Sequence, residues 1–337
     1  MPKIPQRILK SVVYLYEDTQ SAAAGLKFGG TGFLVGMFSE RFPKAFLYQY
    51  VVTNWHVAVR SKNRVVRANS KDGPPYIIKI DDWYSDERFD IAIAPYPANI
   101  PDLDCSIIPP AFFVTPEGIA THSLGPGEDV FMVGRFVDHD GGETNRPAVR
   151  FGNISVMPTP LEQPNNVLAD AFVIDMHSRP GYSGSPVFVF RTPGYDLEER
   201  LGQGAEQSLL LSGVNFLGLL GIHYDQFPEA WPIIGKFGEI SPVKHDGPII
   251  RGLSGMTKVL PAWSILEVLN MPGLKDIRDK LDDEHEQRLA MQGTGEATGA
   301  SPKQEETPSE SSSSSPDQRA DFTASLGAAE NPRSQED

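Results

Sequence analysis

A tight, glycine-rich turn runs directly into an apolar strand, and this junction decides the fold: Pro180-Gly181-Tyr182-Ser183-Gly184-Ser185-Pro186-Val187. In some α/β proteins a serine at the centre of a Gly-x-Ser-x-Gly pattern lies where a strand turns into a helix. Here the last position of that pattern is Ser185 instead of glycine. Pro186 and the strand 187–190 then follow in place of a helix. The stretch therefore predicts an all-β protein.

The sequence on both sides of this turn shows the same character. Short runs of β-branched and aromatic residues recur, separated by Gly, Pro, Asn and Asp, and helical periodicity is scarce before residue 261. The 31 glycines and 29 prolines among 337 residues agree with many short strands joined by turns. This pattern is typical of antiparallel barrels and sandwiches. A proline-rich stretch at 95–116 is expected to connect two β-units.

The C-terminal part of the sequence differs in composition from the rest. Residues 261–269 combine an early proline with an apolar face, which predicts a helix. Residues 273–292 are highly charged and predict a solvated helix or a linker. Residues 293–337 are rich in Ser, Glu and Pro, with nine acidic and three basic residues. Such a segment buries too little apolar area to offset its chain entropy, so we expect a disordered acidic tail.

The overall charge and the cysteine content exclude several classes of protein. A formal net charge of −14 argues against nucleic acid and anionic membranes as partners. Cys105 is the only cysteine, so an internal disulfide is impossible. The N-terminal segment has no apolar core of signal-peptide length, and the apolar run 207–224 reads better as strands than as a membrane span. We therefore expect a cytoplasmic protein.

Three short motifs carry residues that can act together in catalysis. They are Thr53-Asn54-Trp55-His56-Val57, Asp90-Ile91-Ala92-Ile93 and the turn around Ser183. A serine hydroxyl is a weak nucleophile that needs a base such as histidine, and a carboxylate on the other ring nitrogen of that histidine fixes its tautomer. His56, Asp90 and Ser183 are therefore predicted to be catalytic. This chemistry requires no metal and no cofactor.

The glycines beside the serine suggest how the negative charge of a reaction intermediate would be stabilised. Glycine lets the backbone turn so that successive N–H groups converge on one point. We predict that the amides of Gly181 and Ser183 form an oxyanion hole.

In this order, the three motifs resemble the catalytic motifs of chymotrypsin-fold, or trypsin-like, serine peptidases, especially the bacterial Deg/HtrA-like catalytic domains and the glutamyl endopeptidases. The resemblance covers about residues 8–272. It implies two antiparallel six-stranded β-barrels, over residues 8–105 and 106–272, with a helix closing the second. It also implies a serine endopeptidase that acts on protein or peptide substrates through an acyl-enzyme.

The same resemblance indicates which residues would contact the substrate. In this fold the primary specificity pocket is lined by the residues before the nucleophile and by a later strand. The matching positions here are His177, Ser178, His223, Tyr224 and Asp225. A histidine and a hydroxyl at two of these positions favour an acidic residue before the cut, the P1 position. Asp225 favours a basic P1 residue instead, and a small or apolar P1 residue is a third alternative.

A second function from another class is a latent or non-catalytic peptide-binding or regulatory module on the same fold. Two long insertions, at 191–207 and 226–257, lie near the expected substrate cleft, where they could gate it. The acidic tail offers a site for docking a partner. Turnover of a substrate by the intact chain separates this alternative from a peptidase.

Overall fold

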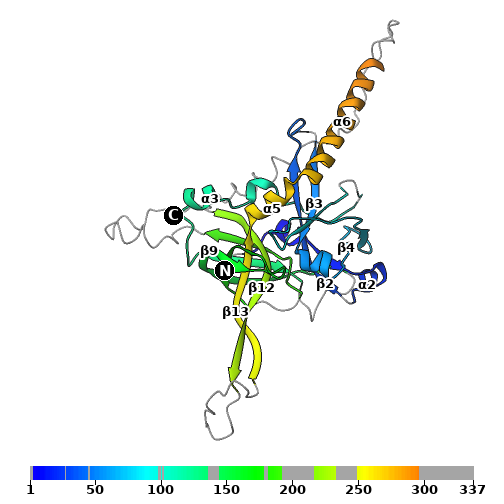
Figure 1. Ribbon diagram of the computed structural model, residues 1–337. Helices are drawn as coiled ribbons and strands as arrows, with labels where there is room; N and C mark the ends of the chain where they lie inside the picture. Colours follow the sequence, from blue (N-terminus) through cyan, green and yellow to red (C-terminus); the bar gives the residue numbers. More distant parts are fainter. Residues whose placement is uncertain are drawn as a thin grey trace, which may run out of the picture. The chain divides into compact units, whose positions relative to one another are not determined.

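The computed structural model describes residues 3–26, 28–44, 46–97, 100, 102–135, 144–177, 181–191, 216–232 and 249–295. Residues 1–286 form one compact unit and residues 287–337 a second. Strands predominate up to residue 261, and helices follow (Figure 1). The all-β fold with C-terminal helices is confirmed. The predicted tail at 293–337 falls, from residue 296 onward, outside the described residues.

The first β-unit is a seven-stranded antiparallel sheet in the order β5-β4-β1-β2-β3-β7-β6. Its strands are β1 (Val12–Tyr16), β2 (Phe28–Phe38), β3 (Leu47–Thr53), β4 (Val65–Ala68), β5 (Tyr76–Lys79), β6 (Tyr84–Ser85) and β7 (Ala92–Pro95). The resemblance implied six strands, and the additional one is β6. This strand pairs only two residues with β7, and so short a pairing leaves no alternating pattern in the sequence.

The second β-unit is a closed barrel in the order β10-β13-β12-β11-β8-β9. Its strands are β8 (Asp129–Gly134), β9 (Ala148–Glu162), β10 (Leu168–Asp175), β11 (Pro186–Arg191), β12 (Phe216–Pro232) and β13 (Ile249–Pro261). β12 and β13 pair along almost their whole length and form a long hairpin (Figure 1). Strand β11 is the strand predicted after the glycine-rich turn.

Helices, all short except the 24-residue α6, lie at the ends and connections of the two units. They are α1 (Gln6–Leu9), α2 (Thr19–Ala24), the π-helical turn η1 (His56–Arg60), the 3-10 turn η2 (Pro110–Phe112), α3 (Pro116–Thr121), α5 (Ala262–Leu269) and α6 (Pro272–Gly295). In the described ranges, none of the helices combines the length and the apolarity that a membrane span needs.

Apolar packing joins the two β-units. One buried cluster contains side chains from both, such as Tyr14 and Phe33 from the first and Phe131 and Phe188 from the second, together with Ile265 of α5. Two further clusters fill the interior of each unit separately. Because the shared cluster is continuous, the two units are held together by burial of apolar surface, which is the main favourable contribution to folding.

The first half of α6 is attached to the end of the β2–β3 hairpin by a buried polar contact. Asp282 is 3% exposed. Its carboxylate accepts hydrogen bonds from the hydroxyl of Ser39, at 2.8 and 3.0 Å, and from the hydroxyl of Tyr48. The ring of His285 packs edge-on against Phe42 and Phe46. The highly charged α6 is therefore held against the β2–β3 hairpin by one buried acid, Asp282.

Removing this acid is expected to destabilise the protein. Asp282→Ala removes the buried acceptor of the Ser39 and Tyr48 hydroxyls, of which Tyr48 keeps a 3.3 Å contact to the carbonyl of Arg278, and we expect the free energy of unfolding to fall by about 3 kcal/mol. Chemical denaturation of the full chain measures the change. Asp276→Ala is the matched control, because it removes an exposed acid from the same helix. Equal losses in the two variants would contradict a stabilising role for the buried carboxylate.

Candidate active site

His56 and Asp90 meet in a buried, two-point contact. His56 opens η1 directly after strand β3, and Asp90 lies in the short segment between β6 and β7. One carboxylate oxygen of Asp90 accepts from the backbone N–H of His56 at 2.8 Å, and the other lies 2.6 Å from Nδ1 of the ring. The Asp90 side chain is fully buried, whereas that of His56 is 14% exposed. A carboxylate can only accept, so Nδ1 carries the proton and Nε2 is free to act as a base.

The main chain at Asp90 is held by two side-chain amides. Its carbonyl accepts from Nδ2 of Asn54 at 2.9 Å, and its N–H donates to Oε1 of Gln163 at 2.7 Å. Asn54 comes from the segment that carries His56, whereas Gln163 comes from the second β-unit. Both amide side chains are buried. The main chain that carries the Asp90 carboxylate is therefore held from both β-units.

The turn that carries Ser183 is docked on strand β2 through Thr31. The backbone N–H of Thr31 donates to the carbonyl of Ser183 at 3.0 Å, and its hydroxyl donates to the carbonyl of Gly181 at 2.7 Å. The carbonyl of Thr31 in turn accepts from the hydroxyl of Thr53 at 2.7 Å. Thr53 lies three residues before His56, so one residue of β2 links the serine turn to the strand that ends at the histidine.

Gly184 shows how closely the serine turn approaches the first β-unit. Its φ is +85°, a region that favours glycine. A Cβ at this position would lie 2.0 Å from the carbonyl oxygen of Thr31 and 2.5 Å from the hydroxyl oxygen of Thr53. Any side chain here would push the turn away from β2 and β3. The glycine that follows the serine is therefore required by packing as well as by backbone conformation.

The backbone N–H groups of Gly181 and Ser183 have no acceptor within the described part of the chain. Gly181 adopts a φ of +96°, and its peptide carbonyl is fixed by Thr31. Unpaired, fixed N–H groups can bind a developing negative charge.

His223 lies in β12 directly beside the serine turn. Its N–H donates to the carbonyl of Ser185 at 2.9 Å, and its carbonyl accepts from the N–H of Gly184 at 3.0 Å. The ring is 2% exposed, with Nδ1 located 3.2 Å from the carbonyl of Tyr182. Because a carbonyl only accepts, Nδ1 carries the proton of the neutral ring. Nε2 is then a buried acceptor that has no hydrogen-bond partner among the residues the structure describes.

Burial lowers the pKa of His223 to about 4. The carbonyl of Tyr182 and the carboxylate of Asp225 act in the opposite direction, and His56 adds a smaller lowering effect. The ring is therefore neutral at pH 7, with Nε2 unprotonated.

The other predicted substrate-contacting residues differ in their surroundings. The carboxylate of Asp225 pairs with the ammonium group of Lys258 on β13 at 2.9 Å, and that ammonium also lies 4.8 Å from the centre of the Phe227 ring. Tyr224 is 1% exposed and belongs to the shared core, where burial is the main cause that raises the pKa of its phenol. The charge of Asp225 is thus balanced within the protein.

The residues just before the serine turn are described only in part. The exposed ring of His177 lies against Gly255 of β13, since a Cβ on that glycine would approach the ring to 2.9 Å. Ser178 lies outside the described residues, as do most of the insertion at 191–207 and the central part of that at 226–257. The outer parts of the second insertion belong to the β12–β13 hairpin.

Several residues of the site had no predicted role. Thr31 and Thr53 occur within recognisable motifs, but their hydroxyls contact groups far apart in the sequence. Gln163 and Lys258 follow no local pattern at all, because each finds its partner only through the pairing of distant strands. Lys258 could have been found only by predicting that β12 and β13 pair in the register that sets it opposite Asp225.

Residues 30–192 match the family model of the trypsin-like peptidase domain. The matched range includes His56, Asp90 and Ser183. The resemblance to trypsin-like peptidases that the sequence motifs predicted is therefore confirmed, and with it the chymotrypsin-like fold. No curated protein matches the chain at a significant level.

Three solved structures are distantly similar to this chain. The apo MamO protease domain from Magnetospirillum magneticum is 16% identical, with a TM-score of 0.44, over 79% of this chain and 98% of that one. The inactive form of the Rv3671c protease is 18% identical, with a TM-score of 0.41, over 78% and 88% of the two chains; the protein comes from M. tuberculosis H37Rv. Deg5 is 16% identical, with a TM-score of 0.40, over 65% and 81%.

The neutral, buried His223 predicts a loss of stability in acid. Its pKa is lower in the folded chain than the ordinary 6.5 of the unfolded one, so the unfolded state takes up a proton first as the pH falls. The contribution of this group is complete above pH 6.5 and is lost as the pH falls toward 4. Between pH 7 and 4.5 the unfolding free energy of the wild type should fall by about 2 kcal/mol more than that of His223→Gln.

Urea denaturation at the two pH values measures this difference. His122→Gln is the control, because it removes a half-buried histidine that packs against Phe216. It should lose stability in parallel with the wild type. A parallel loss in His223→Gln as well would contradict a neutral, desolvated His223.

Proposed function

We propose that this protein is a serine endopeptidase in which Ser183 is the nucleophile, His56 the general base and Asp90 the residue that orients the base. The observation that supports this most directly is the fully buried Asp90 carboxylate, which uses both oxygens on His56. Protonated Nδ1 leaves Nε2 as the ring atom that can accept a proton. The docking of the serine turn on Thr31 and Thr53 supports a shared site.

The chemistry follows from these roles. As the hydroxyl oxygen of Ser183 attacks the scissile carbonyl, Nε2 of His56 takes the hydroxyl proton, and Asp90 stabilises the resulting imidazolium. The amides of Gly181 and Ser183 bind the oxyanion that forms. His56 then returns its proton to the leaving amine, and the peptide remains bound to Ser183 as an ester. Water then attacks the ester carbonyl while Nε2 of His56 takes one of its protons, and His56 passes that proton to the Ser183 oxygen as the bond to the acid product breaks.

Covalent labelling tests this proposal without knowledge of the substrate. A fluorophosphonate probe should react with Ser183, because such probes report a serine activated by a base. Ser183→Ala should abolish the label, and His56→Ala should slow it by a factor on the order of a million. Peptide mapping of the adduct identifies the residue. Ser185→Ala is the matched control, since Ser185 is buried in the same turn and should not affect labelling.

Absence of label on the folded wild-type chain would contradict the proposed nucleophile. It would favour the alternative of a latent or non-catalytic peptide-binding module. Label on another serine would overturn the assignment of Ser183 as the nucleophile, but it would still support an enzyme with an activated serine.

For the P1 side chain, we propose an acidic residue recognised by His223. A basic P1 residue is disfavoured because Lys258 already balances the charge of Asp225. Nε2 of His223, which is buried and has no partner within the described part of the chain, is the atom that we assign to the P1 group. In the neutral ring it only accepts, whereas a carboxylate requires a donor, so an acidic P1 residue binds together with one additional proton on His223.

This proton requirement gives a measurable signature. The ratio of kcat/KM for a peptide with Glu at P1 to that for the same peptide with Gln should rise as the pH falls from 8 to 6, by up to about tenfold per pH unit. Effects on His56 cancel in the ratio, because both peptides need the same base. His223→Gln should make the ratio independent of pH. A flat ratio in the wild type would rule out an acidic P1 recognised by this histidine.

A further inference from the structure

The contact between Asp90 and His56 depends on how the main chain at Asp90 is placed. Two hydrogen bonds, of 2.6 and 2.8 Å, leave the carboxylate of Asp90 little freedom. Asp90 lies in a short segment between β6 and β7, and β6 pairs only two residues with its neighbour. At its C-terminal end the segment is anchored by β7, which pairs with β3 over four residues. At its N-terminal end strand pairing holds it weakly, so other contacts are needed to fix the residues between the two strands.

Gln163 supplies such a contact from the opposite barrel. It directly follows β9 and is 3% exposed. Its side-chain oxygen accepts from the N–H of Asp90 at 2.7 Å. Its side-chain nitrogen donates to the carbonyl of Arg88 at 2.9 Å, and lies 3.3 Å from that of Val167. One amide thus satisfies a donor and an acceptor two residues apart on the segment that carries Asp90.

The chemistry of the contact is specific for an amide side chain. The N–H of Asp90 needs an acceptor, and the carbonyl of Arg88 needs a donor. A primary amide offers both at its end, whereas a carboxylate offers only acceptors and an aliphatic chain offers neither. Because the site is buried, water cannot readily replace the missing partner, and a buried polar group without a partner is costly.

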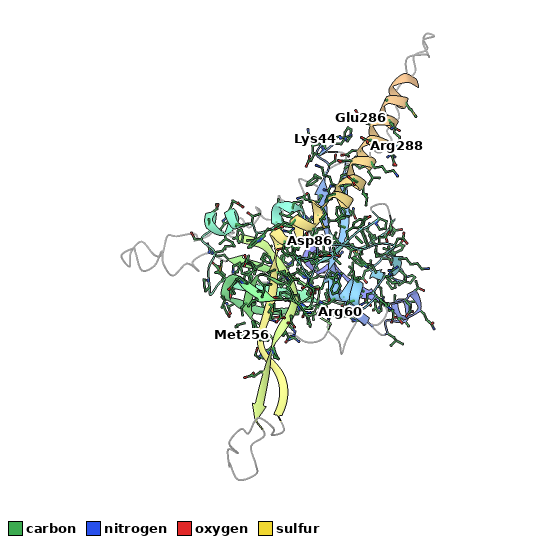
Figure 2. The ribbon with its side chains drawn as sticks, in the orientation of Figure 1. Lys44, Arg60, Asp86, Met256, Glu286 and Arg288 are labelled. Atoms are coloured by element: carbon green, nitrogen blue, oxygen red, sulfur yellow. The ribbon has the colours of Figure 1, made fainter. Side chains whose placement is uncertain are left out.

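The turn that carries Gln163 is itself fixed. Its N–H donates to the carbonyl of Val167 at 3.0 Å, and its carbonyl accepts from the N–H of Asn166, which has a positive φ of 63°. Nδ2 of Asn165 donates to the carbonyl of Glu87 at 3.0 Å. Arg60, labelled in Figure 2, donates to the carbonyl of Pro164 at 3.1 Å. The β9–β10 turn therefore contacts both the Asp90 segment and the helical turn that begins at His56.

We infer that Gln163 is a positioning residue that fixes the main chain at Asp90 from the second barrel and thereby directs the carboxylate onto His56. This inference rests on the proposed function for its catalytic consequence. The effect of Gln163 on the contact between Asp90 and His56 does not depend on that function. The positioning role and the proposed function can therefore be tested separately.

The direct test is proton NMR of the full-length Ser183→Ala chain at pH 5. The proton between Nδ1 of His56 and Asp90 should give a far-downfield signal in the imidazolium form, and this signal requires no turnover. Gln163→Met keeps the size of the side chain but removes both hydrogen bonds, so the signal should disappear or move upfield. Asn165→Ala is the matched control, because it removes a hydrogen bond of the same turn that does not involve Asp90, and the signal should remain.

Gln163→Glu provides a rescue. A buried carboxyl is expected to be protonated at pH 5, because burial disfavours the charged form. It then accepts from Asp90 and donates to Arg88, as the amide does. The signal should therefore be retained at pH 5 and, as the pH is raised, lost at a lower pH than in the Ser183→Ala parent that keeps Gln163. An unchanged signal in Gln163→Met would overturn the inference, as would its loss in Asn165→Ala to the same extent.

In the active chain, Gln163→Met should lower kcat by about ten- to a hundredfold with little change in KM, the scale expected for a displaced catalytic group. A fall confined to thermal stability, with kcat unchanged, would also overturn the inference. If the wild-type chain shows no turnover and no labelling of Ser183, the proposed function fails, while the NMR comparison still decides the role of Gln163.

Discussion

The buried carboxylate of Asp90 is the constraint on which the described site depends. A fully buried charge is tolerated only when its oxygens are satisfied, and here both are bound to His56. The same two bonds set the tautomer of the ring and its direction. Surrounding elements are arranged to hold this pair: Asn54 and Gln163 fix the main chain of Asp90, and strand β3 ends at the turn that carries His56.

Thr31 has a corresponding role for the serine turn. Its N–H and hydroxyl bind two carbonyls of that turn, while its own carbonyl accepts from Thr53 on the neighbouring strand. Its hydroxyl oxygen also accepts from the N–H of Arg135 at 3.1 Å. One residue of β2 therefore connects the second barrel to the strand that leads to His56. The lack of a side chain at Gly184 is what allows the two barrels to approach to this distance.

The sequence alone predicted the elements of this arrangement that leave a local signature. The glycine-rich turn, the strand after it and the apolar run after Asp90 are visible in composition and alternation, and they led to the correct fold class. Contacts between residues distant in the chain leave no such signature. Gln163 lies 73 residues from Asp90, and Asp282 lies 243 residues from Ser39. Their roles follow from the way strands of two barrels are brought together, which local periodicity does not encode.

The distribution of buried polar groups also bears on the choice between a peptidase and a module that only binds. A domain selected for stability alone gains little from a buried acid that is paired with a partly exposed histidine, because apolar side chains of similar size are at least as stable there. Natural proteins keep arrangements that are unfavourable for stability mainly at their functional sites. In this chain Asn54 and Gln163 are buried and bind the main chain of Asp90, whose buried carboxylate binds His56. His223 adds a second desolvated imidazole directly beside the serine turn. Maintaining these costly features around Ser183 favours a site that performs chemistry over one that only holds a peptide.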